Sequence, residues 1–140
     1  MSNTAELYQV LIMDRSKNPR FSGRLEVFDA ESTGENPMCG DHLHVFLKRD
    51  GARVTHESRG CAIMTASADL MAEAVAGKTV AEITEMQKAF EAVVTTGQAN
   101  AALGNLNALA GVSEYRSRIR CATLPWSALG EAMEKDFQHG

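Results

Sequence analysis

The spacing of apolar residues at the start of the chain indicates a helix. Leu7, Val10 and Leu11 recur at helical intervals, so residues 5–13 are predicted to form a helix with one apolar face. Residues 17–20 should end it, because they contain a proline and the residue before a proline avoids the helical region.

A period of two residues, which is typical of strands, follows. Residues 23–30 alternate, with Leu25 and Val27 on one side, and are predicted to form a strand. Residues 31–38 are rich in serine, threonine, glycine, asparagine and proline, and this composition predicts a loop.

A second alternating segment covers residues 41–49 and predicts another strand. Asp50-Gly51 follows it directly and is a strong hairpin signal, so residues 53–58 should form the returning strand. The residues expected on one face of the second strand are Leu43, Val45 and Leu47.

After residue 61 the apolar period becomes helical. One helix should stop at Gly77, a second should begin at Thr79 as N-cap, and residues 97–104 should form a loop. Residues 105–110 suggest a single helical turn, and residues 111–121 a connection with a strand-like tail. The last amphipathic helix should carry Trp126, Leu129, Met133 and Phe137, with Pro125 near its start.

This order of elements predicts the class of the fold. Strands are grouped together and helices are grouped together, which indicates α+β rather than the alternation of a parallel-sheet protein. At 140 residues we expect a single domain over 1–140, with disordered tails at 1–5 and 138–140.

Composition excludes several classes of function. The net charge is −4 and the pI is about 5.5, which does not match the basic surface of a nucleic-acid-binding protein. No apolar run approaches the length of a membrane span, and the first residues do not have the pattern of a signal peptide. We therefore expect a cytoplasmic protein that binds neither nucleic acid nor a membrane.

The three cysteines are the main candidates for chemistry. An odd number without a signal peptide argues against a disulfide framework. Cys39, Cys61 and Cys121 all fall at the predicted ends of elements, and a helix N-terminus beside Cys61 and Cys121 should lower their thiol pKa values. Their spacing alone leaves two interpretations open, a shared metal site or three independent buried thiols.

The other candidate ligands have simpler explanations. Asp41 follows Gly40 and is a common type of turn residue. The four histidines are expected to be structural or exposed rather than metal ligands, and they are His42, His44, His56 and His139.

Sequence motifs around the cysteines favour a shared metal site over three independent buried thiols. Asn-Pro-Met-Cys-Gly-Asp at 36–41, Gly-Cys-Ala-Ile at 60–63 and Arg-Cys-Ala-Thr-Leu-Pro-Trp at 120–126 resemble the family of NifU N-terminal domains, IscU and SufU. The resemblance extends over about residues 7–129 and includes Ala-Ser-Ala-Asp-Leu-Met at 66–71. It implies a small three-stranded antiparallel sheet packed against several helices.

Two features resemble the SufU branch of this family. The segment between the helix after Cys61 and Cys121 is long, as in SufU, whereas the cluster scaffolds lack this insertion. Arg120 occupies the position where the scaffolds have a histidine. The chain departs from the family at Ser58, where a second glycine is common, and at Met64 and Asp69.

The resemblance implies a site and a reaction. Cys39, Asp41, Cys61 and Cys121 would bind one zinc ion, with iron or an iron–sulfur cluster as the alternative. The protein would be a zinc-dependent sulfurtransferase, taking persulfide sulfur from a PLP-dependent cysteine desulfurase of the SufS type. It would pass the sulfur to downstream Suf cluster-assembly proteins.

Roles for individual residues follow from this prediction. Cys39 is the expected sulfur acceptor because it lies between Pro37 and Gly40, and Cys121 is the second candidate. Arg118 and Arg120 are expected to offset the negative charge of the site or to contact a partner. An iron–sulfur cluster scaffold and a structural zinc adaptor remain as alternative functions.

Overall fold

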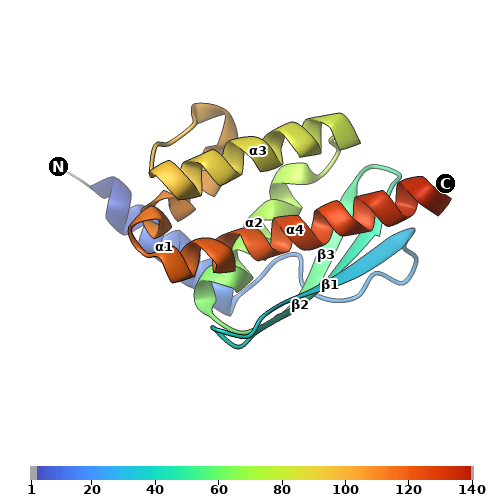
Figure 1. Cartoon of the computed structure of the whole chain (residues 1–140), viewed down its shortest axis with the longest axis horizontal. Helices are drawn as coiled ribbons and strands as arrows, with labels where there is room; N and C mark the ends of the chain where they lie inside the picture. The colour runs from blue at the N-terminus through green and yellow to red at the C-terminus, as the bar shows by residue number, and fades with distance from the viewer. Residues whose placement is uncertain (1–2, 140) are drawn as a thin grey trace.

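The computed structural model describes residues 3–139, which form a three-stranded sheet and a set of helices (Figure 1). The predicted α+β class is confirmed. The elements in chain order are α1 (Asn3–Lys17), β1 (Ala30–Asn36), β2 (Asp41–Lys48), β3 (Arg53–Arg59), α2 (Ala62–Val75), α3 (Val80–Thr96), the 3₁₀ segment η1 (Ala101–Glu114) and α4 (Arg116–His139).

The sheet is antiparallel throughout, with the strand order β1-β2-β3. Asn36 pairs with Asp41 at the end of the β1–β2 ladder, and His42 pairs with Arg59 at the same end of β2 and β3. The predicted β2–β3 hairpin is confirmed, and Gly51 in its turn has a positive φ of 78°.

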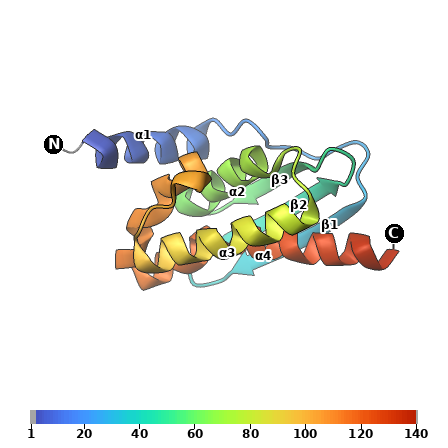
Figure 2. The ribbon, with the colours of Figure 1, turned by 90° about the horizontal axis from the view of Figure 1, so that it is seen from above.

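Helices cover one face of the sheet, and the other face is covered only in part, where Arg24 and Phe28 pack on the buried Phe46. α4 crosses β1 and β2, α2 packs on β3, and α1 lies along α2 (Figure 2). α3 and η1 pack together on the far side of these helices. The core between the layers includes Phe90 and Trp126, whose rings stack with centroids 5.4 Å apart.

The position of the first strand differs from the prediction. Residues 23–29 form bends rather than a strand, and β1 occupies residues 30–36, where a loop was expected. Val27 is 67% exposed while Leu25 is buried, so the two do not share an apolar face. Tertiary contacts stabilise β1 in spite of its turn-forming residues, since α4 packs against it.

The first helix is confirmed, but its apolar face is not the predicted one. α1 ends at Lys17, just before the Asn18-Pro19 step. Leu7 and Val10 are 65% and 66% exposed, whereas Leu11 and Ile12 pack against the core.

The predicted helices after the sheet are confirmed, including their caps. α2 ends before Gly77, whose φ is 78°. Thr79 is the N-cap of α3 and forms a capping box with Glu82, in which each side chain accepts a hydrogen bond from the other residue's backbone N–H.

The connection to the last helix was predicted incorrectly. Residues 101–114 form η1, with a kink at Gly104, and α4 begins at Arg116 rather than after Cys121. Cys121 and Pro125 therefore lie inside α4. The first turns of α4 lack an apolar pattern because Arg116, Arg118 and Arg120 all face solvent.

The helices also extend into the predicted tails. Residues 3–5 belong to α1 and residues 138–139 to α4, while residues 1, 2 and 140 lie outside the described part of the chain. Within residues 3–139, no helix combines the length and apolar character needed to span a membrane.

Candidate metal centre

Cys39 lies at the tip of the hairpin that joins β1 to β2. The backbone N–H of Cys39 donates to Asn36 O at 3.1 Å, and that of Gly40 donates to Pro37 O at 3.3 Å, which closes a tight turn. Gly40 has a φ of 67°, a conformation that favours glycine. The turn leaves Cys39 partly exposed and its neighbour Met38 88% exposed.

Asp41, the first residue of β2, is fully buried. Its Oδ1 accepts a hydrogen bond of 2.8 Å from the backbone N–H of Cys61. Its Oδ2 lies 3.7 Å from Cys61 Sγ. One carboxylate oxygen is thus held by the backbone, and the other is directed at a thiol.

Cys61 is the N-cap of α2 and is partly exposed. Its Sγ accepts a hydrogen bond from the backbone N–H of Met64 at 3.4 Å. Gly60, just before it, has a φ of 149°, and a Cβ there would lie 2.8 Å from Asp41 Cα. Only glycine permits this close approach between the end of β3 and the start of β2.

Cys121 is fully buried in α4, and its Sγ lies 3.1 Å from Cys39 Sγ. Asn36 Nδ2 donates to Cys121 Sγ at 3.6 Å. Burial, reinforced by hydrogen bonds with Cys39, Asp41 and Cys61, raises the pKa of the Cys121 thiol. The expected lowering is wrong for Cys121, because this residue lies within the helix and not at its N-terminus.

The four side chains form one cluster from three separate parts of the chain. Ligand atoms of Cys39, Asp41 and Cys121 all lie within 4.8 Å of one another, and Cys61 adjoins them through Asp41. Ligands of a tetrahedral zinc ion lie roughly 3.5–4 Å apart, given bonds of about 2.0–2.3 Å. The two thiols and the carboxylate of Cys39, Cys121 and Asp41 suit a zinc ion at these separations, whereas Cys61 lies near Asp41 but outside this closest group.

The two arginines expected near the site differ in their positions. The pKa of Arg118 is raised, mainly by negative charge on Cys61. Burial lowers this pKa, and a hydrogen bond to Cys121 raises it further. Arg118 therefore adjoins the cysteines. The side chain of Arg120 is exposed, and among the described residues no hydrogen bond or ion pair joins it to them.

The histidines whose side chains are described lie outside the cluster. His42 and His44 are on the face of the sheet away from the helices, where they contact Glu35 and Glu31. His56 is buried and bonds to both Asp69 and Ser58. The side chain of His139 is not among those described.

Asn36 and Gly60 contribute to the site but were not singled out by sequence reasoning. Asn36 is 2% exposed and contacts Cys121 from the end of β1. Both residues belong to the cysteine motifs, so their positions beside Cys39 and Cys61 were the available signal. Their roles depend on contacts across the fold that spacing does not reveal.

The fold and the cluster together define a class of small α+β proteins with a hairpin-borne cysteine and a buried carboxylate. Residues 7–122 match the model of the NifU-like N-terminal domain. The chain therefore belongs to the NifU-like N-terminal domain family, which includes SufU and IscU.

Individual relatives are similar over nearly their whole length. The zinc-dependent sulfurtransferase SufU of Bacillus subtilis is 38% identical, covering 96% of this chain and 95% of the relative. The iron–sulfur cluster assembly scaffold protein IscU of Streptococcus pyogenes is 36% identical, covering 96% and 87%. A solved SUF-system protein, FiSufU from Fervidobacterium islandicum AW-1, has a TM-score of 0.81 and 34% identity, covering 92% of this chain and 98% of that one.

Proposed function

We propose that this protein is a zinc-dependent sulfur acceptor that takes persulfide sulfur from a SufS-type cysteine desulfurase for iron–sulfur cluster assembly. The observation that carries the proposal is the convergence of Cys39, Asp41, Cys61 and Cys121 at one end of the sheet. Similarity to a zinc-dependent sulfurtransferase over 96% of the chain supports it.

Cys39 is the proposed acceptor because of its place in the fold. It lies on a turn between two strands and is partly exposed, whereas Cys121 is fully buried within a helix. The Cys39 thiolate attacks the outer sulfur of the desulfurase persulfide. The S–S bond of the donor breaks, its cysteine leaves as a thiolate, and Cys39 becomes the persulfide, so no net oxidation occurs.

The remaining cluster residues position the Cys39 thiol and set the charge around it. Cys39, Asp41, Cys61 and Cys121 are the proposed ligands, and a bound zinc ion would keep the thiols in their thiolate form. The Cys61 N–H orients Asp41, and Asn36 contacts the Cys121 sulfur. Arg118 offsets negative charge beside Cys61.

The proposal is tested by locating the transferred sulfur. The protein is incubated with desulfurase and cysteine, and mass spectrometry of peptides locates the added sulfur. We expect it on Cys39, and Cys39→Ser should abolish stimulation of the desulfurase. Asp41→Ala keeps all three thiols and should retain part of the zinc, because water can occupy a vacant ligand position. In that variant Cys39 should still gain sulfur.

The other outcomes separate the alternatives. Sulfur on Cys121 or Cys61 with Cys39 unmodified would show that another cysteine is the acceptor, and the sulfur-acceptor function would still hold. No sulfur on any cysteine would exclude the sulfur-acceptor function. A brown protein containing iron and sulfide would then favour a scaffold, and a colourless zinc protein would favour a structural adaptor.

A further inference from the structure

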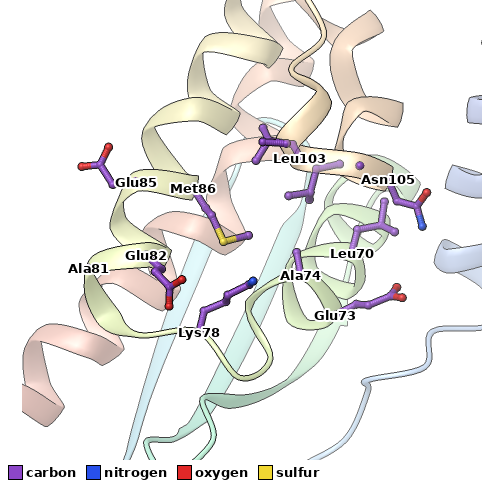
Figure 3. A pocket seen from close by; sticks show the side chains of 13 residues that line it. Leu70, Glu73, Ala74, Lys78, Ala81, Glu82, Glu85, Met86, Leu103 and Asn105 are labelled. Carbon is purple, nitrogen blue, oxygen red and sulfur yellow. The ribbon is translucent and has the colours of Figure 1, made fainter.

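A groove of about 670 Å³ lies between α2, α3 and the first half of η1, and none of the three cysteines lines it (Figure 3). Its floor is apolar and is formed by Leu70 and Ala74 of α2, Met86 of α3 and Leu103 of η1. Figure 3 shows Met86 reaching from α3 toward α2 between the two helices. Methionine adapts its shape to different apolar partners.

The rim of the groove is acidic on both sides. Glu73 stands on the α2 side, Glu82 and Glu85 stand on the α3 side, and Lys78 is the only basic residue in the lining. Glu73 pairs with Arg15, and Glu85 lies 3.6 Å from Lys88. The pair of Glu85 with Lys88 is highly exposed on both sides, so solvent weakens it, and in the lining itself three carboxylates face one lysine. A hydrogen bond from the Thr79 N–H lowers the pKa of Glu82.

Hydrogen bonds hold the walls of the groove in place. Asn107 donates to the carbonyl oxygens of Asn100 at 2.8 Å and Gly104 at 3.0 Å, and it accepts from the Asn100 N–H at 2.8 Å. The capping box at Thr79 fixes the start of α3 on the opposite wall. A groove held in this way loses little conformational entropy when it is filled.

We propose that this groove docks an amphipathic helix of a partner protein, with apolar residues on one face and lysine or arginine on both flanks. The apolar floor takes the apolar face, and the acidic rim complements the basic flanks. The same acidic rim disfavours an anionic membrane surface. The groove is open to solvent, which fits a helix laid on the surface better than a small molecule enclosed on most sides.

The test uses a synthetic peptide and three single-residue variants. The peptide is a helix-forming sequence with leucines at i, i+3, i+4 and i+7 and lysines on both flanks, and its binding is followed by fluorescence anisotropy. A second peptide has glutamates in place of the lysines. Glu85→Lys and Ala102→Arg each place a positive charge at the exposed rim, while Glu91→Lys makes the same charge change on α3 outside the lining.

We expect saturable binding of the lysine peptide that weakens at least about tenfold in Glu85→Lys and Ala102→Arg, and less than about twofold in Glu91→Lys. Circular dichroism checks that each variant is folded. No saturable binding, equal binding of the glutamate peptide, or equal loss in all three variants would overturn the proposal. Concentration-dependent self-association of the protein that Glu85→Lys abolishes, measured by light scattering, would also overturn it by assigning the groove to a second copy.

Discussion

Gly60 is the residue on which the geometry of the cysteine cluster depends most directly. A methyl group at this position would lie 2.8 Å from Asp41 Cα, and the backbone φ of 149° is itself unfavourable for alanine. Gly60→Ala should therefore displace Asp41 from the Cys61 N–H. We expect zinc affinity to fall by about 10–100-fold, as for other losses of groups that orient a metal ligand.

Competition with a chromophoric zinc chelator measures this loss. Gly111→Ala is the matched control, because a Cβ at Gly111 meets nothing within 4 Å and its φ is not positive. Unchanged zinc affinity in Gly60→Ala would show that Asp41 does not need this close contact.

A second residue of consequence is Asp69, which is buried and far from the exposed surface. It accepts hydrogen bonds from Arg15, from His56 and from the backbone N–H groups of Arg20 and Phe21. Burial opposes ionisation, but these hydrogen bonds together lower the pKa of Asp69 from 3.8 to about 2. Asp69→Asn should destabilise the fold by about 3–5 kcal/mol, because it removes the buried carboxylate that pairs with Arg15 and leaves that guanidinium only the half-exposed Glu73.

The pH dependence of this effect has a definite sign. A carboxyl with a lowered pKa in the folded state stabilises the protein above pH 3.8, and this contribution disappears as the pH falls toward 2. Urea unfolding in the presence of a chelator measures the free energy of unfolding of both proteins. The difference in this free energy between wild type and Asp69→Asn should become smaller as the pH falls over that range. Glu73→Gln changes a carboxylate that is 45% exposed, and it should lower the free energy of unfolding much less than Asp69→Asn does.

Among the elements, α3 depends on its N-terminal cap. The Thr79 side chain accepts from the Glu82 N–H at 3.1 Å, and Glu82 accepts in return from the Thr79 N–H at 2.9 Å. Thr79→Ala should cost about 1 kcal/mol in the free energy of unfolding. Thr84→Ala is the control, since its hydroxyl only bonds to Val80 O inside the helix, and it should change stability by less than about 0.5 kcal/mol.

β1 shows where local sequence signals fail in this chain. Its residues favour turns, but Ser32 bonds to Glu131 of α4, and Gly34 lies under Leu124. A Cβ at Gly34 would lie 3.0 Å from Leu124 Cδ1, so this glycine serves helix packing and not a turn. By contrast, the β2–β3 hairpin and the α3 cap depend on contacts between near neighbours, and the sequence was sufficient to predict them.

The candidate site was predictable for a different reason. The cysteine motifs resemble a known family, and that resemblance predicts that Cys39, Asp41, Cys61 and Cys121 lie together and bind one ion. Spacing alone could not do this, because Cys121 approaches Cys39 only through the packing of α4 on β1. The groove between α3 and η1 was not predictable either, since the path of residues 101–114 departs from the single helical turn expected there.

At the scale of the whole molecule, the cluster joins three parts of the fold at one end. It links the β1–β2 turn, the start of α2 and the second turn of α4. Cys121 belongs to the apolar core and Cys39 and Cys61 pack against it, but most of that core, including the stacked rings of Phe90 and Trp126, consists of other residues. Removal of zinc should therefore lower the melting temperature by several degrees without unfolding the helices. A loss of 1–2 kcal/mol would produce a shift of about this size in a domain of this length.

Circular dichroism at 222 nm, before and after complete chelation, checks both parts of this prediction. The helical signal at room temperature should persist, and the midpoint should fall. In Cys39→Ser, chelation should shift the midpoint less, because one of the proposed ligands is already lost. A wild-type melting curve unchanged by zinc removal would contradict the linkage between the cluster and the fold, since a ligand that binds only the folded state must stabilise it.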